Sequence, residues 1–409
     1  MNKLQPRSLP VNIPLPEVLI IGAGMYVCGR GTSSYGTILP TLVQAQRAGI
    51  IGQIRIAATS QTSIEQLEKR LHELNKLMGT NTQIIGYPNV GKDPHSYKTA
   101  LAETSHPACA IVAVPDHLHH QITSEVIKHG IHPLIVKPFT PTVTEGLQLI
   151  ELTNSHNVYG AVEFHKRFDE SNLVLRQAIS DGKLGDLSYV TVEYSQKRLV
   201  RDIFSSWINE TNIFQYLGVH YVDLIYFLTN ALPVKALATS QCITSSYPDS
   251  IQAIIEWQAP SGMKFVSTIT TNWIDPNSTS AMSDQKITVV GSNGRFQADQ
   301  KNRGVQLITE NSSGMEEINP YFSQIYKNDE DQMGVHGYGP KSITRFIEDV
   351  IQVVSDNVDR TILEVMRPSF TNALVSTSVI EAVNISLENG NEWVSIQPTT
   401  GLNAIPITQ

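Results

Sequence analysis

The stretch that decides the fold is Val18-Leu19-Ile20-Ile21-Gly22-Ala23-Gly24, an apolar run that ends in two glycines. Consecutive apolar residues predict a short strand that is covered on both faces. Gly22 permits a tight turn directly after the strand, and Gly24 lets the backbone approach a phosphate group. The N-terminus of the next helix is expected to supply N–H donors. The stretch therefore predicts a dinucleotide-binding turn, although a purely structural turn also explains a lone glycine pair.

The rest of the turn departs from the usual three-glycine pattern. Val27 stands at the third glycine position, and the turn continues through Gly29, Gly31 and Gly36. We therefore expect a loop that is longer than usual.

Strands and helices alternate beyond this turn. The predicted strands are Ile54–Ala58, Ala110–Val114, Pro133–Val136 and Val158–Glu163. The predicted helices are Ser63–Met78, His117–His129 and Val143–Ser155. This alternation indicates βαβ units, so we expect an α/β domain with a doubly wound parallel sheet over residues 15–164.

The pattern changes after Phe164 to strands without helices between them. These strands are predicted at Leu187–Lys197, Lys235–Ile243, Ser250–Gln258, Lys264–Trp273, Lys286–Val290 and Gly304–Thr309. Helical patterns return at Phe214–Leu228, Ser342–Ser355 and Ser369–Leu387, and long loops are expected at Asp275–Gln285 and Asn328–Gly339. Residues 165–409 are thus predicted to form an α+β domain for substrate binding and oligomerisation. Its open-faced, mostly antiparallel sheet would carry helices on one face.

Composition excludes several classes of function. The chain has 409 residues and a formal net charge of −8, which predicts two domains and no nucleic-acid partner. It lacks an apolar run long enough to cross a membrane, and residues 1–17 lack the apolar core of a signal peptide. Cys28, Cys109 and Cys242 are too far apart for a disulfide framework or a zinc motif. A reducing cytoplasm is the expected location.

The end of the second predicted strand bears on cofactor choice. An acid at this place binds the ribose hydroxyls of NAD, but the strand runs into Thr59 and Ser60, and the first acid is Glu65. Small hydroxyl side chains do not repel a 2′-phosphate. The cofactor is predicted to be NADP or NAD, with a slight preference for NADP.

Several further stretches bear a family resemblance. They are Val114-Pro115-Asp116-His117-Leu118-His119, Val136-Lys137-Pro138, Gly218-Val219-His220-Tyr221-Val222-Asp223-Leu224 and Arg367-Pro368-Ser369-Phe370. Together with the glycine turn they resemble the Gfo/Idh/MocA family, named for glucose–fructose oxidoreductase, inositol dehydrogenase and a rhizopine-catabolism protein. The resemblance implies an NAD(P)-binding Rossmann domain and hydride transfer to or from a carbinol or ketone carbon. The substrates it implies are sugars, cyclitols or sugar-nucleotide-like compounds.

The candidate site residues follow from the strand ends and the resemblance together. The cofactor-binding set is Gly22, Gly24, Met25, Tyr26, Thr59, Ser60, Pro115, Asp116, His119 and Lys137. The catalytic set is Lys137, His220 and Tyr216, and the substrate-binding set adds Arg167 to these three. We expect no metal, because His117, His119 and His120 point in different directions on a helix.

Lys137 is the expected proton-transfer group. It follows the fourth predicted strand, at the carboxyl edge where α/β sheets bind ligands, and Pro138 keeps it extended. Burial would lower its pKa towards working pH. Two departures from the family pattern leave the proton relay open. Val136 replaces an acid, and Tyr216 replaces an Asp four residues before His220.

Two alternatives of the same fold stay open at this point. One is a ligand-sensing protein without catalysis, and the other is a glycosidase or isomerase that retains its cofactor. We also expect a homodimer or homotetramer that buries the open sheet face.

Overall fold

The computed structural model describes residues 14–310, 314–399 and 403–407. β1 (Glu17–Ile21) lies within a six-stranded parallel sheet of order β3-β2-β1-β4-β5-β6. The other strands are β2 (Ile54–Ala57), β3 (Ile84–Tyr87), β4 (Ala108–Val112), β5 (His132–Val136) and β6 (Ala161–Glu163). Because the strand order reverses between β1 and β4, the loops that follow these strands flank a crevice at the carboxyl edge.

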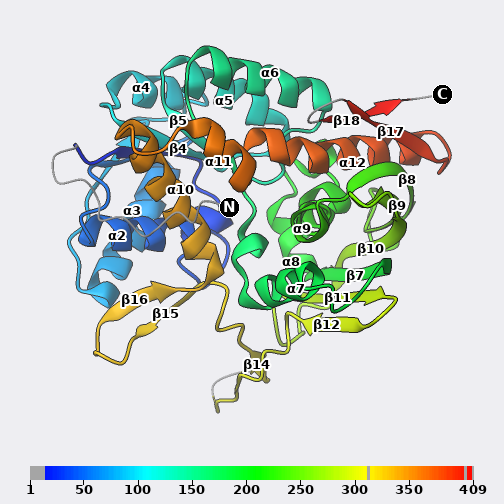
Figure 1. The fold of residues 1–409 in the computed structure, drawn as a ribbon. Coiled ribbons are helices and arrows are strands. Elements are labelled where there is room, and N and C mark those ends of the chain that lie inside the picture. The colour runs from blue at the N-terminus through cyan, green and yellow to red at the C-terminus, as the bar shows by residue number, and fades with distance from the viewer. Residues whose placement is uncertain (1–13, 311–313, 400–402, 408–409) are drawn as a thin grey trace.

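Helices cover both faces of this sheet, as Figure 1 shows. They are α2 (Ile38–Arg47), α3 (Gln61–Met78), α4 (Ser96–Glu103), α5 (His119–Lys128) and α6 (Val143–Ser155). Sequence analysis missed β3, α2 and α4. β3 is a half-exposed edge strand interrupted by Gly86, and Pro40 lies in the first turn of α2, so neither carries a clear periodic pattern.

The second sheet has eight strands in the order β12-β11-β7-β10-β9-β8-β17-β18. They are β7 (Leu187–Lys197), β8 (Leu232–Gln241), β9 (Ser250–Gln258), β10 (Lys264–Asp275), β11 (Ser283–Gly291), β12 (Arg295–Asp299), β17 (Val394–Thr399) and β18 (Asn403–Ile407). The sheet is mixed rather than purely antiparallel. β7 and β10 pair in parallel. A long crossover containing α8 (Arg198–Ile203) and α9 (Val219–Thr229) leads from β7 to β8, and β8, β9 and β10 then follow as antiparallel neighbours.

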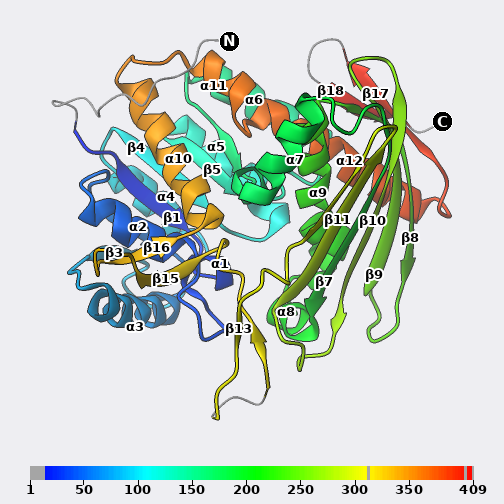
Figure 2. The same cartoon turned by 60° about the horizontal axis from the view of Figure 1, so that its bottom comes forward.

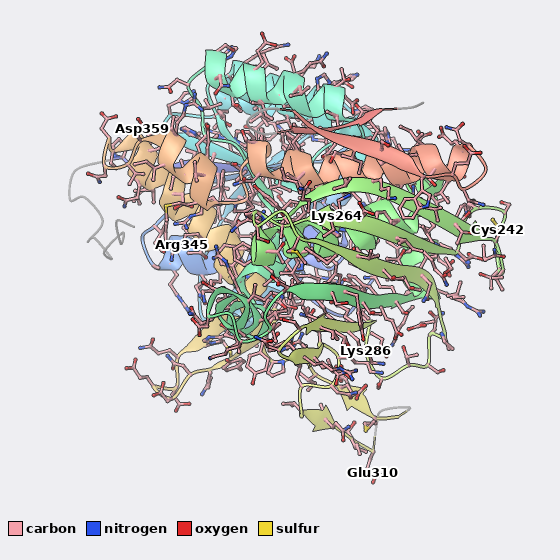
Figure 3. All side chains as sticks on the ribbon, turned by 45° about the vertical axis from the view of Figure 1, so that its right-hand side comes forward. Cys242, Lys264, Lys286, Glu310, Arg345 and Asp359 are labelled. Atoms are coloured by element: carbon pink, nitrogen blue, oxygen red, sulfur yellow. The ribbon has the colours of Figure 1, made fainter. Side chains whose placement is uncertain are left out.

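Only one face of the second sheet is covered by helices. Figure 2 shows α7 (Glu170–Ser180), α9 and α12 (Phe370–Glu388) on that side. Burial alternates along β9, where Ala253 and Ile255 face the core and Ile254 faces outward. Figure 3 looks onto the outer face, on which Lys264 and Lys286 lie, and no helix of the described chain crosses it. The expected open-faced architecture is confirmed.

The predicted strand Gly304–Thr309 is wrong in extent. Only β13 (Gln306–Leu307) forms, and it pairs with β14 (Glu316–Glu317) in a separate two-stranded hairpin. Both residues of β13 are exposed, so no core stabilises a longer strand. The predicted loop Asn328–Gly339 is also wrong, because it contains β16 (Met333–His336), which pairs with β15 (Gln324–Lys327).

The chain returns to the first sheet after β16. α10 (Tyr338–Val354) packs Ile343, Phe346 and Ile347 into the same hydrophobic cluster as α2 and α3, and α11 (Arg360–Met366) follows it. α12 contributes Phe370 and Leu374 to the cluster on the other face of the first sheet. Its later residues join the core of the second sheet instead. Within the described residues, no helix has both the length and the apolar composition to cross a membrane.

Candidate active site

The glycine turn is sterically fixed at Gly22. Its φ of 121° is unfavourable for other residues, and a Cβ there would lie 2.1 Å from the carbonyl oxygen of Ala113. Gly24 is exposed, and a Cβ built on it has no atom within 4 Å. The turn therefore passes closely over the end of β4 and leaves open space beside Gly24, a shape that fits a dinucleotide pyrophosphate.

The helix after the glycines is shorter than expected. α1 contains only Met25–Cys28, Gly29 ends it at a φ of 73°, and α2 begins nine residues further on. A helix of one turn has a small macrodipole, so the contribution of a helix N-terminus is smaller than expected. Met25 and Tyr26, on this short helix, are half-buried.

The end of β2 is polar and cationic. Thr59 is exposed, while Ser60 caps α3 by accepting a hydrogen bond from Ser63 N at 3.2 Å. Nη1 of Arg30 donates to Ser63 Oγ at 3.2 Å. Sequence reasoning missed Arg30, because this residue belongs to the glycine loop and only the fold brings it to the end of β2.

Lys137 follows β5 directly and is half-buried. Its Nζ donates a hydrogen bond to the backbone oxygen of Tyr216 and lies 3.6 Å from the centroid of the Tyr216 ring. Burial lowers the pKa of Lys137 to about 7, and the charges of Asp116 and Glu163 act in the opposite direction. With this pKa, a substantial fraction of the Lys137 side chains is the neutral amine at physiological pH.

Asp116 connects the first domain to the second. Its Oδ2 accepts hydrogen bonds from Thr211 Oγ1 at 2.7 Å and from Gln215 Nε2 at 2.8 Å. Pro115, just before it, begins a single helical turn. Asp116 thus lies close enough to Lys137 to act on it electrostatically and ties the loop after β4 to the segment before α9.

Both ring nitrogens of His119 contact backbone carbonyl oxygens of the protein itself. Its Nδ1 lies 2.8 Å from the carbonyl oxygen of Pro138, and its Nε2 lies 3.0 Å from that of Val114. The ring therefore bridges the loops after β4 and β5 and supports the segment that carries Lys137. Whether it also lines the cofactor groove stays a prediction.

Tyr216 and His220 do not lie on one regular α-helix. Phe214–Gly218 forms a π-helical turn, a feature frequent at functional sites, and α9 begins at Val219. His220 is buried and its Nδ1 has no hydrogen-bond partner in the described structure. Burial, with the charges of Lys137, His165 and Lys166, lowers the pKa of His220 well below its usual value. Burial raises the pKa of Tyr216.

The guanidinium of Arg167 is occupied by a buried ion pair with Asp223. Its Nε and Nη2 donate to the two carboxylate oxygens of Asp223 at 2.8 and 2.5 Å, and both side chains are buried. Its guanidinium also lies 5.1 Å from the Phe227 ring centroid. This pairing holds the segment after β6 against α9, and we propose no substrate role for Arg167.

Three polar residues at the end of β6 were missed by sequence reasoning. Glu163 and His165 form a buried pair, with His165 Nδ1 2.9 Å from Glu163 Oε2. Lys166 is buried, and its Nζ donates to the amide oxygens of Gln285 and Gln300. Burial lowers the pKa of Lys166 to about 7. The rule that pointed to Lys137, a polar residue just past a parallel strand, also points to these positions.

The arrangement can bind and deprotonate an alcohol. A lysine of lowered pKa and a neutral histidine lie where the carboxyl edge of the first sheet meets the covered face of the second. No group of three or more His, Cys, Asp or Glu residues with the geometry of a metal site occurs in the part of the chain that the structure describes.

Comparison with protein families gives two matches. Residues 17–164 match an oxidoreductase family with an NAD-binding Rossmann fold, and residues 173–297 match the C-terminal domain of the GFO/IDH/MocA family. Among curated proteins, an uncharacterized oxidoreductase of Schizosaccharomyces pombe is 24% identical over 217 residues, which are 51% of this chain and 57% of that protein. The scyllo-inositol 2-dehydrogenase (NADP(+)) IolW of Bacillus subtilis is 30% identical over 126 residues, 29% of this chain and 35% of that protein. The matched segments thus span little more than half of these relatives at most.

Solved structures match over nearly the whole chain. Scyllo-inositol dehydrogenase from Lactobacillus casei, with bound NAD(H) and scyllo-inositol, gives a TM-score of 0.63 at 14% identity. The match covers 94% of this chain and 99% of that one. GenD2 from gentamicin A biosynthesis, in complex with NAD, gives a TM-score of 0.66 at 16% identity and covers 97% and 100% of the two chains. At these identities the likeness shows the common fold.

Proposed function

Since the chain belongs to the Gfo/Idh/MocA family of oxidoreductases, we propose that it transfers a hydride between a nicotinamide cofactor and a carbinol or ketone carbon. The proposed substrates are sugars, cyclitols or sugar-nucleotide-like compounds, in line with the inositol dehydrogenases among its relatives. The observation that carries the proposal is Lys137, whose pKa of about 7 suits proton exchange with an alcohol.

In the oxidation direction, Lys137 acts as the base. Its neutral amine takes the hydroxyl proton as the C–O bond becomes a carbonyl, and oxidised nicotinamide, when bound, is the hydride acceptor. His220, kept neutral by burial, donates a hydrogen bond to the same oxygen and orients it. Reduction runs through the same groups, with the Lys137 ammonium returning the proton to the oxygen.

The two departures from the family pattern alter the surroundings of this base. Val136 and Tyr216 stand where the family pattern has acidic residues. Asp116 and Glu163 nevertheless act on Lys137 electrostatically. The lysine therefore keeps nearby negative charge from other positions. This supports a working oxidoreductase over a protein that only senses ligands.

For the cofactor, we propose a preference for NADP over NAD. The end of β2 offers the hydroxyls of Thr59 and Ser60, and Arg30 reaches the same place from the glycine loop. A guanidinium among hydroxyl groups suits a 2′-phosphate, because arginine binds phosphates through several donors in one plane. The acid Glu65 is engaged instead by Gln61, which donates to it at 2.8 Å.

We further propose a cytoplasmic homo-oligomer, a dimer or tetramer, that buries the outer face of the second sheet. Exposed apolar side chains on this face include Tyr189, Ile254 and Val266. A partner copy would remove them from water. Cys28 and Cys109 are buried free thiols, which suits a reducing compartment.

The experiment that tests the function is a polyol panel with NAD⁺ or NADP⁺, followed by absorbance of the reduced nicotinamide. Turnover of at least one sugar or cyclitol is the expected result. Cofactor that stays bound through purification without net turnover would instead indicate a glycosidase or isomerase. Cofactor binding without any chemistry would indicate a sensor.

A further inference from the structure

Side chains from five separate segments meet at the ring of His165. Glu163 comes from β6, and Tyr26 comes from the glycine turn, with its hydroxyl 3.5 Å from His165 Nδ1. The ring centroids of His220, Phe322 and Tyr338 lie 4.7, 5.2 and 5.7 Å from that of His165. His165 therefore lies between the glycine turn and His220, where the two domains meet.

The hydrogen bonds of His165 leave one ring nitrogen free. Nδ1 lies 2.9 Å from Glu163 Oε2, and the other carboxylate oxygen of Glu163 accepts a hydrogen bond from Ser342. Because a carboxylate only accepts, it holds the hydrogen of a neutral imidazole on Nδ1 and leaves a lone pair on Nε2. Nε2 has no hydrogen-bond partner among the described residues, and about 10% of the side chain is exposed. An imidazole oriented by a carboxylate is the arrangement that enzymes use for proton transfer.

Lys137 needs a route for its proton in every turnover. It is half-buried, and its Nζ is hydrogen-bonded to the backbone oxygen of Tyr216. The phenol of Tyr216 offers no basic site for that proton, because burial raises its pKa and keeps it protonated. Burial and neighbouring cations also make His220 hard to protonate. Lys137 interacts electrostatically with Glu163 and with His220, whose ring centroid lies 4.7 Å from that of His165. His165 is thus an imidazole in this neighbourhood that has a carboxylate on its ring.

We propose that His165, held by Glu163, is the proton relay between Lys137 and solvent. The inference rests on the proposed oxidoreductase function. In oxidation, the proton taken up by the Lys137 amine passes through a bridging water to Nε2 of His165 and then to bulk water. Lys137 returns to the neutral amine, and no electrons move in this step. The titratable groups facing His165 are Glu163, Tyr26, His220 and Tyr338, with Lys166 next to it in the chain.

Chemical rescue tests the relay in the full-length protein with a polyol that wild type oxidises. His165→Ala should lower kcat by about 10²-fold, the low end of acid–base contributions. Free imidazole in the assay should restore part of that kcat in a saturable way, because it fills the space and carries the proton. His165→Gln keeps a hydrogen-bond donor for Glu163 and fills the space, so it should be equally slow and should not respond to imidazole. His72→Ala, which removes an exposed histidine on α3, is the matched control and should change nothing.

The possible failures are distinguishable. Wild type that oxidises no polyol contradicts the proposed function and the relay together. Active wild type with equally active His165→Gln overturns the relay alone. Slow His165→Ala that imidazole leaves unchanged, in a protein that melts and binds cofactor normally, would show that the imidazole matters for packing and not for proton transfer.

Discussion

Replacing Lys137 by alanine separates proton transfer from binding. The variant removes the amine while leaving the glycine turn, Asp116 and His119 in place, so cofactor affinity should stay almost intact. The expected loss in kcat is about 10²–10⁴-fold, or roughly 3–5 kcal/mol of barrier. Steady-state kinetics with the best polyol gives the loss, and calorimetric titration of the cofactor gives the binding control.

The pH dependence gives the prediction a second readout. Burial lowers the pKa of Lys137 from 10.5 to about 7. At about pH 8 roughly nine-tenths of the amines are then neutral, whereas an ordinary lysine would have well under about 1% neutral. Because oxidation needs the neutral amine, kcat/KM of wild type should rise with pH and level off above about 7. Lys137→Ala should lose this step.

Tyr216→Phe addresses the remaining ambiguity. A small effect leaves Lys137 as the base, since the phenyl ring still packs beneath Nζ. A loss as large as that of Lys137→Ala would make the phenol and the lysine one catalytic unit. Near-normal turnover by Lys137→Ala, with a confirmed substrate, would refute the assignment of this lysine and would favour the sensor or an altered chemistry.

Three further predictions concern cofactor choice, stability and assembly. Arg30→Ala should weaken NADP binding by about 10- to 100-fold, the value of a charged hydrogen bond, and leave NAD almost unchanged in titration calorimetry; tighter binding of NAD by wild type would contradict the proposed preference. Arg167→Ala should cost about 3–5 kcal/mol in urea unfolding, because Asp223 would be left buried and unpaired; a loss below about 1 kcal/mol would show that water reaches the carboxylate. Wild type should be a dimer or tetramer by light scattering, and Val266→Lys on the outer sheet face should dissociate it; a monomeric wild type at micromolar concentration would refute the interface.

The fold was predictable where the sequence pattern has a direct physical cause. Leu187–Lys197 and Ser250–Gln258 alternate in burial because one sheet face is covered, and both ranges were predicted to the residue. The parallel pairing of β7 with β10 was not predictable, because strand direction depends on the path of the intervening chain. The short α1 was missed for a similar reason, since turn geometry after Gly24 depends on the contacts of Gly29 with Ser34 across the loop.

The site was predictable only where residues lie beside a recognisable strand end. Lys137 follows β5 directly and Asp116 lies in the loop after β4, and the structure places them close enough to interact. Arg30 was missed, because its meeting with Ser63 depends on how the long glycine loop folds. The ion pair of Arg167 with Asp223 joins positions 56 residues apart, a contact that no local pattern encodes.

The return of the chain to the first sheet has a consequence for biosynthesis. Val335, Phe346 and Leu363 share one hydrophobic cluster with β1, α2 and α3. On the ribosome, the nucleotide-binding half therefore emerges long before the side chains that complete its core. Until residue 363 has left the exit tunnel, α2 and α3 expose an apolar surface that chaperones recognise. We expect a fragment that ends at residue 164 to aggregate. We also expect the two halves of the full chain to fold together, late and cooperatively.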